Sequence, residues 1–170
     1  EYDISLDYFN KCIENKDNKD LTFLSFSHLY CIYRNKNIDL YNFLEQFKNI
    51  FPDRAEPLFF LALYLMSKNN YKKSIQLLLQ AIKIPIPNTL YPINTIIYTK
   101  EIPFLLCENL FLQENYDKVS ILLKKYHKLF PDDFRLINMI YHMTNSKPKQ
   151  SIELEKPVIV FCAKSGIQDW

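Results

Sequence analysis

Apolar residues recur three and four positions apart along most of the chain, which is the pattern of amphipathic α-helices. Residues 54–83 carry two such stripes with a polar turn between them. The stripes are formed by Leu58, Leu61, Ala62 and Leu65 before the turn and by Ile75, Leu78, Leu79 and Ile82 after it. Two stripes joined by a short turn predict a pair of helices packed as a hairpin.

Residues 100–129 repeat this pattern. Apolar stripes again flank a polar turn, and Tyr116 stands where Tyr71 stands in the first hairpin, 45 positions earlier. Helical-hairpin repeats of about 34 residues are common, and this spacing is longer. Residues 84–94 hold three prolines, each of which lacks a backbone donor and disfavours helix for the residue before it. An extended loop is therefore predicted between the two hairpins.

The same periodicity predicts further helical elements on both sides: a single helix over residues 3–15, a hairpin over 20–51 and a closing helix, or cap, over 132–145. The sequence thus predicts an all-α domain over residues 1–145. Residues 146–156 are polar and contain prolines, so a linker is expected there. The β-branched run within 157–170 predicts a short C-terminal strand, the start of a further domain or a tail.

Acidic residues mark two of the predicted helix starts. Asp53 and Glu56 have the spacing of a capping box, with Asp53 in the place of the usual serine or threonine. Asp132 stands where the N-cap of the closing helix is expected, and its carboxylate would accept hydrogen bonds from unpaired backbone amides.

The composition narrows the classes of function. The chain has 170 residues and a single glycine, Gly166, whereas phosphate-binding loops and dinucleotide-binding turns need several. A net charge of +2 gives no strong attraction to nucleic acid or to a membrane surface. No apolar run approaches the roughly 18 residues of a membrane span. We therefore expect neither a nucleic-acid partner nor a membrane partner.

The residues that usually carry chemistry form no convergent set. The four cysteines, Cys12, Cys31, Cys107 and Cys162, lie far apart without a CxxC pair, so we predict reduced and mostly buried thiols in a cytoplasmic protein. His28 lies one helical turn from Cys31, but nothing beside them supplies an orienting carboxylate, and core packing explains the histidine. The sequence predicts no catalytic residue, no metal site and no cofactor.

The hairpins resemble tetratricopeptide repeats, in which small residues stand where paired helices touch and a proline lies near each repeat end. The matching positions are Leu61, Ala62, Tyr71 and Ala81 in one repeat and Cys107, Tyr116 and Pro131 in the next. The resemblance implies a superhelix of stacked hairpins. Ser74, Val119 and Tyr126 depart from the pattern because alanine is usual there, so helix pairs are expected to splay or shift.

A narrower resemblance rests on the segment Arg54-Ala55-Glu56-Pro57 and the Ile-Pro-Ile-Pro run at residues 84–87. This combination is similar to the helical-repeat region of multidomain, family-2-type glycosyltransferases of bacteria and giant DNA viruses. The family often shows Tyr-Asp in the inserted loop, where this chain has Tyr98-Thr99. Because the chain begins with Glu1 and lacks a catalytic carboxylate motif, the resemblance implies the accessory part of a longer protein.

The resemblance also places a set of residues on the concave face. Tetratricopeptide domains that bind a chain-end carboxylate carry Lys and Asn on their inner helices. The groove of this chain is instead predicted to hold the apolar residues Phe59, Leu63, Met66, Phe104 and Phe111 together with Glu108, so a carboxylate would find no cation there. A large apolar patch is either a binding site or a surface covered by other parts of the protein. We predict a non-catalytic scaffold whose partner is its own catalytic domain or another protein chain. The alternative is a free-standing interaction module that binds an apolar peptide in this groove.

Overall fold

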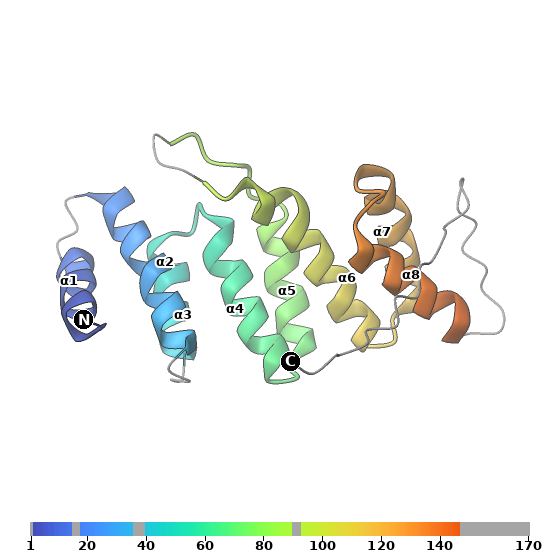
Figure 1. The fold of residues 1–170 in the computed structure, drawn as a ribbon, viewed down its shortest axis with the longest axis horizontal. Coiled ribbons are helices and arrows are strands. Elements are labelled where there is room, and N and C mark those ends of the chain that lie inside the picture. The colour runs from blue at the N-terminus through green and yellow to red at the C-terminus, as the bar shows by residue number, and fades with distance from the viewer. Residues whose placement is uncertain (1, 15–17, 36–39, 90–92, 147–170) are drawn as a thin grey trace, which may run out of the picture. The chain divides into compact units, whose positions relative to one another are not determined.

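In a computed structural model of the protein, described for residues 2–14, 18–35, 40–89 and 93–146, every regular element is helical. The elements are α1 (Tyr2–Glu14), α2 (Lys19–Asn35), α3 (Tyr41–Ile50), α4 (Ala55–Ser67), α5 (Tyr71–Ala81), η1 (Ile97–Glu101), α6 (Ile102–Leu112), α7 (Tyr116–Leu129) and α8 (Phe134–Ser146) (Figure 1). The all-α prediction is confirmed. The strand predicted within 157–170, and the linker beyond Ser146, lie outside the described residues.

The predicted helices are all present at the expected places in the sequence. The helix predicted over 3–15 is α1, the hairpin regions 20–51, 54–83 and 100–129 contain the successive helices from α2 to α7, and the helix predicted over 132–145 is α8. Residues 84–89 and 93–94, in the predicted loop, form no regular element.

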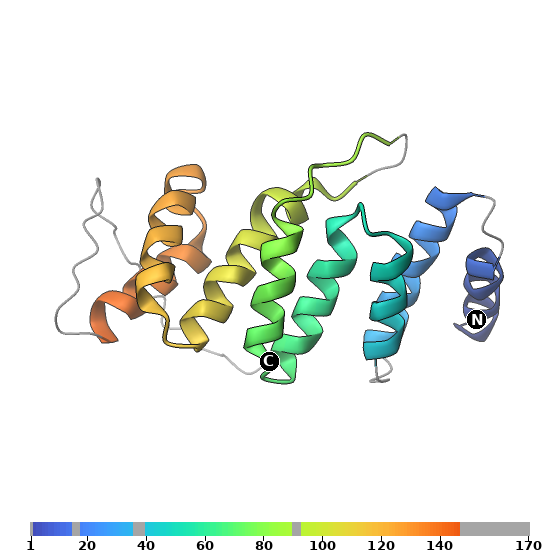
Figure 2. The same ribbon diagram turned by 180° about the vertical axis from the view of Figure 1, so that it is seen from behind.

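The chain divides into two compact units, Glu1–Asn109 and Leu110–Trp170, and the boundary falls inside α6. In the first unit, α1 packs on α2, and α4 packs on both α3 and α5. Figures 1 and 2 show α2 to α5 side by side, each running opposite to the one before it. In the second unit, α7 packs on α8.

Aromatic rings fill the space between α2 and α3. Phe26 and Phe47 are stacked with their centroids 4.9 Å apart, and Phe51 completes a fully buried cluster. A neighbouring cluster joins Tyr30 of α2 to α3 and α4, because Tyr30 stacks on Phe60 at 4.2 Å. Rings of this size hold helices together through area burial and preferred ring geometry. The first unit therefore has a continuous core beneath α2, α3 and α4.

Small residues bring α4 and α5 close together. Ala62 and Ser74 are both fully buried, and the Ser74 hydroxyl donates a 2.9 Å hydrogen bond to the Ala62 carbonyl oxygen. The turn between the helices has Asn69 in the left-handed region, at φ 58°, which asparagine tolerates better than most residues. The Asn70 amide then donates to the Leu65 carbonyl oxygen at 2.8 Å.

The turn between α6 and α7 has the same geometry, 45 positions later. Glu114 has φ 57° where Asn69 has 58°, and the Asn115 amide donates to the Leu110 carbonyl oxygen at 2.9 Å. Buried side chains recur as well, since Val119 and Leu123 stand at the places of the buried Ser74 and Leu78. The two sequence repeats therefore share their backbone geometry at the turn.

A π-helical segment, η1, precedes α6. Pro103 in the first turn of α6 has no N–H, and its ring would clash with the carbonyl four residues earlier. The helix before it is wider, and the Ile102 amide donates to Ile97, five residues back. Single π-turns of this kind are frequent at functional positions. This one carries Tyr98, the residue that reaches the start of α4.

Candidate functional site

The start of α4 holds a buried pair of opposite charges. Arg54 is 8% exposed and Glu56 is 4% exposed. The guanidinium donates from Nη2 to Glu56 Oε1 at 2.8 Å and from Nε to Oε2 at 3.2 Å, which is the bidentate geometry of the strongest arginine–carboxylate pairs. Both charges are thereby compensated inside the fold.

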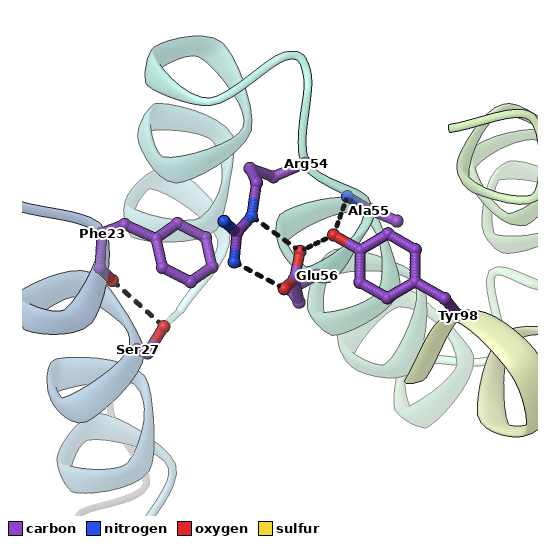
Figure 3. Close-up of polar contacts among 6 residues, drawn as sticks. All are labelled: Phe23, Ser27, Arg54, Ala55, Glu56 and Tyr98. Atoms are coloured by element: carbon purple, nitrogen blue, oxygen red, sulfur yellow. Dashed lines mark hydrogen bonds and ion pairs between the residues drawn. The ribbon is translucent and has the colours of Figure 1, made fainter. Parts of the chain in front are cut away.

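Tyr98 of η1 joins this pair from 42 positions further along the chain. Its hydroxyl donates to Glu56 Oε2 and accepts a 3.3 Å hydrogen bond from the Ala55 amide. Figure 3 shows the ring reaching across from η1 to the first turn of α4. Burial and the hydrogen bond to the Glu56 carboxylate raise the pKa of Tyr98 well above its usual value. The phenol therefore stays protonated and serves as the donor to Glu56.

The other side of Arg54 rests on α2. Its guanidinium carbon lies 3.9 Å from the centroid of the Phe23 ring, a cation–π contact that is clear in Figure 3. Next to it, Lys19 forms a 3.1 Å ion pair with Asp53. The turn before α4 is thus attached to α2 on one side, and α4 is attached to η1 on the other.

These four side chains, Arg54, Glu56, Tyr98 and Phe23, are called the Arg54 cluster below. Both oxygens of Glu56 accept hydrogen bonds within it. A general base must be within reach of its substrate, whereas Glu56 is buried and its two oxygens already accept three hydrogen bonds. The chemistry of the cluster is that of a structural connection between α2, α4 and η1.

The predicted capping box is wrong. The N-cap of α4 is Arg54, with no side-chain cap hydrogen bond, and Asp53 pairs with Lys19. Glu56 does not reach back to the amide of Asp53, because Arg54 binds both of its oxygens. A bidentate ion pair with a guanidinium is stronger than a single hydrogen bond to a backbone amide.

The predicted cap of α8 is displaced by one residue. Asp133, not Asp132, accepts a 3.0 Å hydrogen bond from the Arg135 amide. The same aspartate is bound by the Arg135 side chain, from Nε to Oδ1 at 3.3 Å and from Nη2 to Oδ2 at 3.2 Å. Asp133 rather than Asp132 therefore satisfies an amide in the first turn of α8.

The two helix starts follow equivalent turns. The sequence Phe-Pro-Asp precedes Arg54 and again precedes Asp133, 79 positions later. In both turns the last residue donates its amide to the phenylalanine carbonyl oxygen at 3.2 Å. Each turn is followed by a bidentate pair between residues two apart, but the sign is reversed: arginine comes first at α4, and aspartate comes first at α8.

The residues predicted to line a groove are mostly covered. Phe59 is 7% exposed, and Leu63, Met66, Phe104 and Glu108 are half-buried. Within the first unit, the Asn109 side-chain amide donates to the Met66 sulfur at 3.2 Å. Phe111 belongs to the second unit, where its ring lies 5.7 Å from that of Tyr116. The groove itself stays a prediction.

The repeat positions inferred from the resemblance lie in two different environments. Leu61, Ala62, Ala81 and Cys107 are buried. Tyr71 and Tyr116 are half-buried, and Pro131 is exposed in its turn. Small or apolar side chains therefore occupy the helix contacts, whereas the tyrosines begin α5 and α7.

Two further predictions from the sequence need correction. His28 is exposed and stacks on Phe9 at 5.2 Å, so it is not a core residue. Of the three described cysteines, only Cys107 is buried; Cys31 is exposed and Cys12 intermediate. Burial raises the pKa of the Cys107 thiol to about 12. Among the described residues, no three metal-ligating side chains gather at one place.

The sequence patterns contain Arg54, Glu56 and Tyr98, but they do not indicate that these residues meet. The available signal was Pro57, which favours the first turn of a helix, close to an arginine and a glutamate of opposite charge. Nothing local indicates which distant residue completes such a pair.

Comparisons with protein-family models, with curated proteins and with solved structures give no significant match. None of the described helices combines the length and the apolar character needed to cross a bilayer.

Proposed function

We propose that the protein is a non-catalytic scaffold of tetratricopeptide-like hairpins stacked as a superhelix, and that it is the accessory part of a multidomain glycosyltransferase. Its partner is its own catalytic domain or another protein chain. The observation that carries the proposal is the recurrence of one hairpin geometry at a spacing of 45 residues, at the turns of Asn69 and Glu114. Stacked hairpins of this kind present extended surfaces to other proteins.

The Arg54 cluster supports the link to the glycosyltransferase-associated repeats. That resemblance rests on two sequence features, the Arg-Ala-Glu-Pro segment and the proline-rich loop. Tyr98, which follows the loop, binds Glu56 of the first feature and the amide of Ala55. The segment that follows the loop is therefore in contact with the Arg-Ala-Glu-Pro segment, which is a physical reason for the loop and that segment to occur together.

The absence of catalysis is supported by the state of the buried groups. Glu56 is buried and engaged by Arg54 and Tyr98, and Cys107 has a raised pKa that keeps its thiol protonated. A nucleophile or base needs the opposite conditions. We place the scaffold in the cytoplasm, where an exposed thiol such as Cys31 stays reduced. Residues 157–170 are then the start of a further domain or a tail.

Two experiments test this function. The coding sequence on both sides of residues 1–170 should contain a glycosyltransferase domain with its metal-binding carboxylates; a complete reading frame without one would refute the accessory role. The isolated chain, incubated with UDP-glucose and Mn²⁺, should neither bind nor hydrolyse the nucleotide in calorimetry and chromatography. Turnover by this chain would refute the non-catalytic assignment.

The peptide-binding alternative predicts a different result. Leu63 is half-buried in α4, so Leu63→Glu would place a charge on the predicted groove and abolish recovery of an apolar peptide partner. Equal recovery of protein partners by the wild type and this variant would exclude that alternative and leave the scaffold role standing.

A further inference from the structure

Helix α7 carries an isoleucine in the middle of its solvent-exposed face. Ile121 is 70% exposed, although the same helix buries Val119, Leu123 and Tyr126 on its opposite face. A single exposed apolar residue is ordinary. The residues around this one make the face unusual.

Lysines surround Ile121 at helical spacing. Lys118, Lys124 and Lys125 stand at i−3, i+3 and i+4 and are all exposed, and Lys128 follows one turn later. In the part of the chain that the structure describes, Lys118, Lys124 and Lys125 form no ion pair with a carboxylate. Asp117 is the single acidic residue in α7. This surface, called the Ile121 face, is basic around an apolar centre.

Two further apolar side chains extend this surface at one end. Leu129, the last residue of α7, is 60% exposed, and Phe134, the first residue of α8, is 69% exposed. Both flank the short turn at residues 130–133. The surface therefore changes along α7 from basic with an apolar centre to apolar.

We propose that the C-terminal segment of this same chain, residues 152–161, docks along α7. The segment begins Ile152-Glu153-Leu154-Glu155, in which apolar and acidic residues alternate, and continues after a lysine and a proline with Val158-Ile159-Val160-Phe161. The acidic part binds the Ile121 face, and the apolar part covers Leu129 and Phe134. Opposite charges fix the position of the segment, and apolar burial supplies the attraction.

The length of the intervening chain permits this contact. α8 follows α7 after a turn of a few residues, packs against it and runs back in the opposite direction, so the end of α8 lies toward the start of α7 (Figure 1). Residues 147–151 span up to about 17 Å when extended. Ile121 and Leu129 are eight helical residues apart, or about 12 Å, which six extended residues cover with ease.

The order of residues also agrees. A chain leaving Ser146 and running back along α7 meets the lysines before it meets Leu129 and Phe134, and in the segment the acidic part precedes the apolar part. A tethered segment acts at an effective concentration near the millimolar range. The C-terminal segment of the same chain therefore occupies α7 in preference to a free acidic peptide or a second copy of the protein. This inference treats residues 157–161 as part of a tail, and it does not depend on the scaffold role proposed above.

Zero-length carbodiimide cross-linking of the full chain tests the docking, because it joins only carboxylates and amines that are in contact. Mass spectrometry should find cross-links within one molecule from Lys118, Lys124 or Lys125 to Glu153 or Glu155. The variant Ile121→Asp should lower their yield to about one fifth or less, since it replaces the apolar contact by a like charge. Leu79→Asp, at a 48% exposed leucine of α5, is the matched control and should leave the yield unchanged.

A charge exchange distinguishes the loss of the docking contact from misfolding of a variant. Lys118→Glu with Lys125→Glu should abolish the cross-links at those positions, and adding Glu153→Lys and Glu155→Lys should restore them with the amines and carboxylates exchanged. Cross-linking a mixture of ¹⁵N-labelled and unlabelled protein distinguishes cross-links within one molecule from cross-links between two molecules. Cross-links mainly between copies, no cross-links in folded wild type, or equal yields in Ile121→Asp would each overturn the proposal.

Discussion

The substitution Tyr98→Phe is expected to destabilise the first unit while leaving its core intact. It removes the hydroxyl that donates to Glu56 and accepts from the Ala55 amide, and it retains the ring. A hydrogen bond to a charged group contributes about 1.5–3 kcal/mol. The Ala55 bond is long, at 3.3 Å, and adds little. We therefore expect the free energy of unfolding to fall by about 2–3 kcal/mol.

Urea titration followed by far-ultraviolet circular dichroism measures this change. With a urea slope of about 2 kcal/mol per molar, the midpoint of the first unit should fall by about 1 M. Tyr71→Phe is the matched control: it also removes one hydroxyl that donates to a side chain, Asn69, but at an exposed position. Its midpoint should shift by a few tenths of a molar at most.

Hydrogen exchange of the Ala55 amide locates the effect. This amide should exchange faster in Tyr98→Phe, together with the first turn of α4, whereas the amides of α7 should be unaffected. A variant with the wild-type midpoint and unchanged exchange at Ala55 would show that Tyr98 does not hold the start of α4. The Arg54 cluster would then lose its structural role.

Three further outcomes follow from the structure. Ala62→Leu should destabilise by about 1–3 kcal/mol in urea titration through overpacking, because Ala62 is fully buried against Ser74; unchanged stability would mean a loose contact. The free energy of unfolding should fall as the pH rises above about 10, the usual pKa of tyrosine, because Tyr98 then ionises in the unfolded chain but, with its raised pKa, not in the folded protein. Tyr98→Phe should show a smaller fall with pH. Identical dependence of stability on pH in the variant and the wild type would contradict this. Iodoacetamide at pH 8 should modify exposed Cys31 and spare Cys107 until the protein unfolds, as peptide mapping would show.

The helices could be predicted because their information is local. The spacing of Leu58, Leu61 and Leu65 fixes the buried face of α4, and all three are buried. The same spacing identified α7 and α8. Their turns were also predictable, since polar residues and proline interrupt the apolar stripes at the places where the helices end.

The Arg54 cluster could not be predicted because its partners are distant in sequence. Glu56 has the capping-box spacing from Asp53, so the local sequence predicts that the Glu56 side chain binds the Asp53 backbone amide. The fold instead places Phe23 under Arg54 and Tyr98 beside Glu56, which gives the charges better partners. His28 failed for a related reason: apolar neighbours in sequence suggest burial, but only the packing of α1 and α2 decides which side of the helix faces water.

The charge pairs at α4 and α8 are reversed, and this reversal gives α4 a use for a distant residue at its start. An aspartate at the N-cap satisfies a first-turn amide and suits the positive end of the helix dipole, and Asp133 does this for α8. Arg54 in the same position has no acceptor to offer, and α4 has no side-chain cap. Pro57 has no N–H and so leaves one unpaired amide fewer in the first turn, and the Tyr98 hydroxyl accepts a hydrogen bond from the Ala55 amide. At α4 the later segment therefore supplies what an aspartate supplies at α8, so the segment after the proline-rich loop and the Arg-Ala-Glu-Pro sequence stabilise the same helix start.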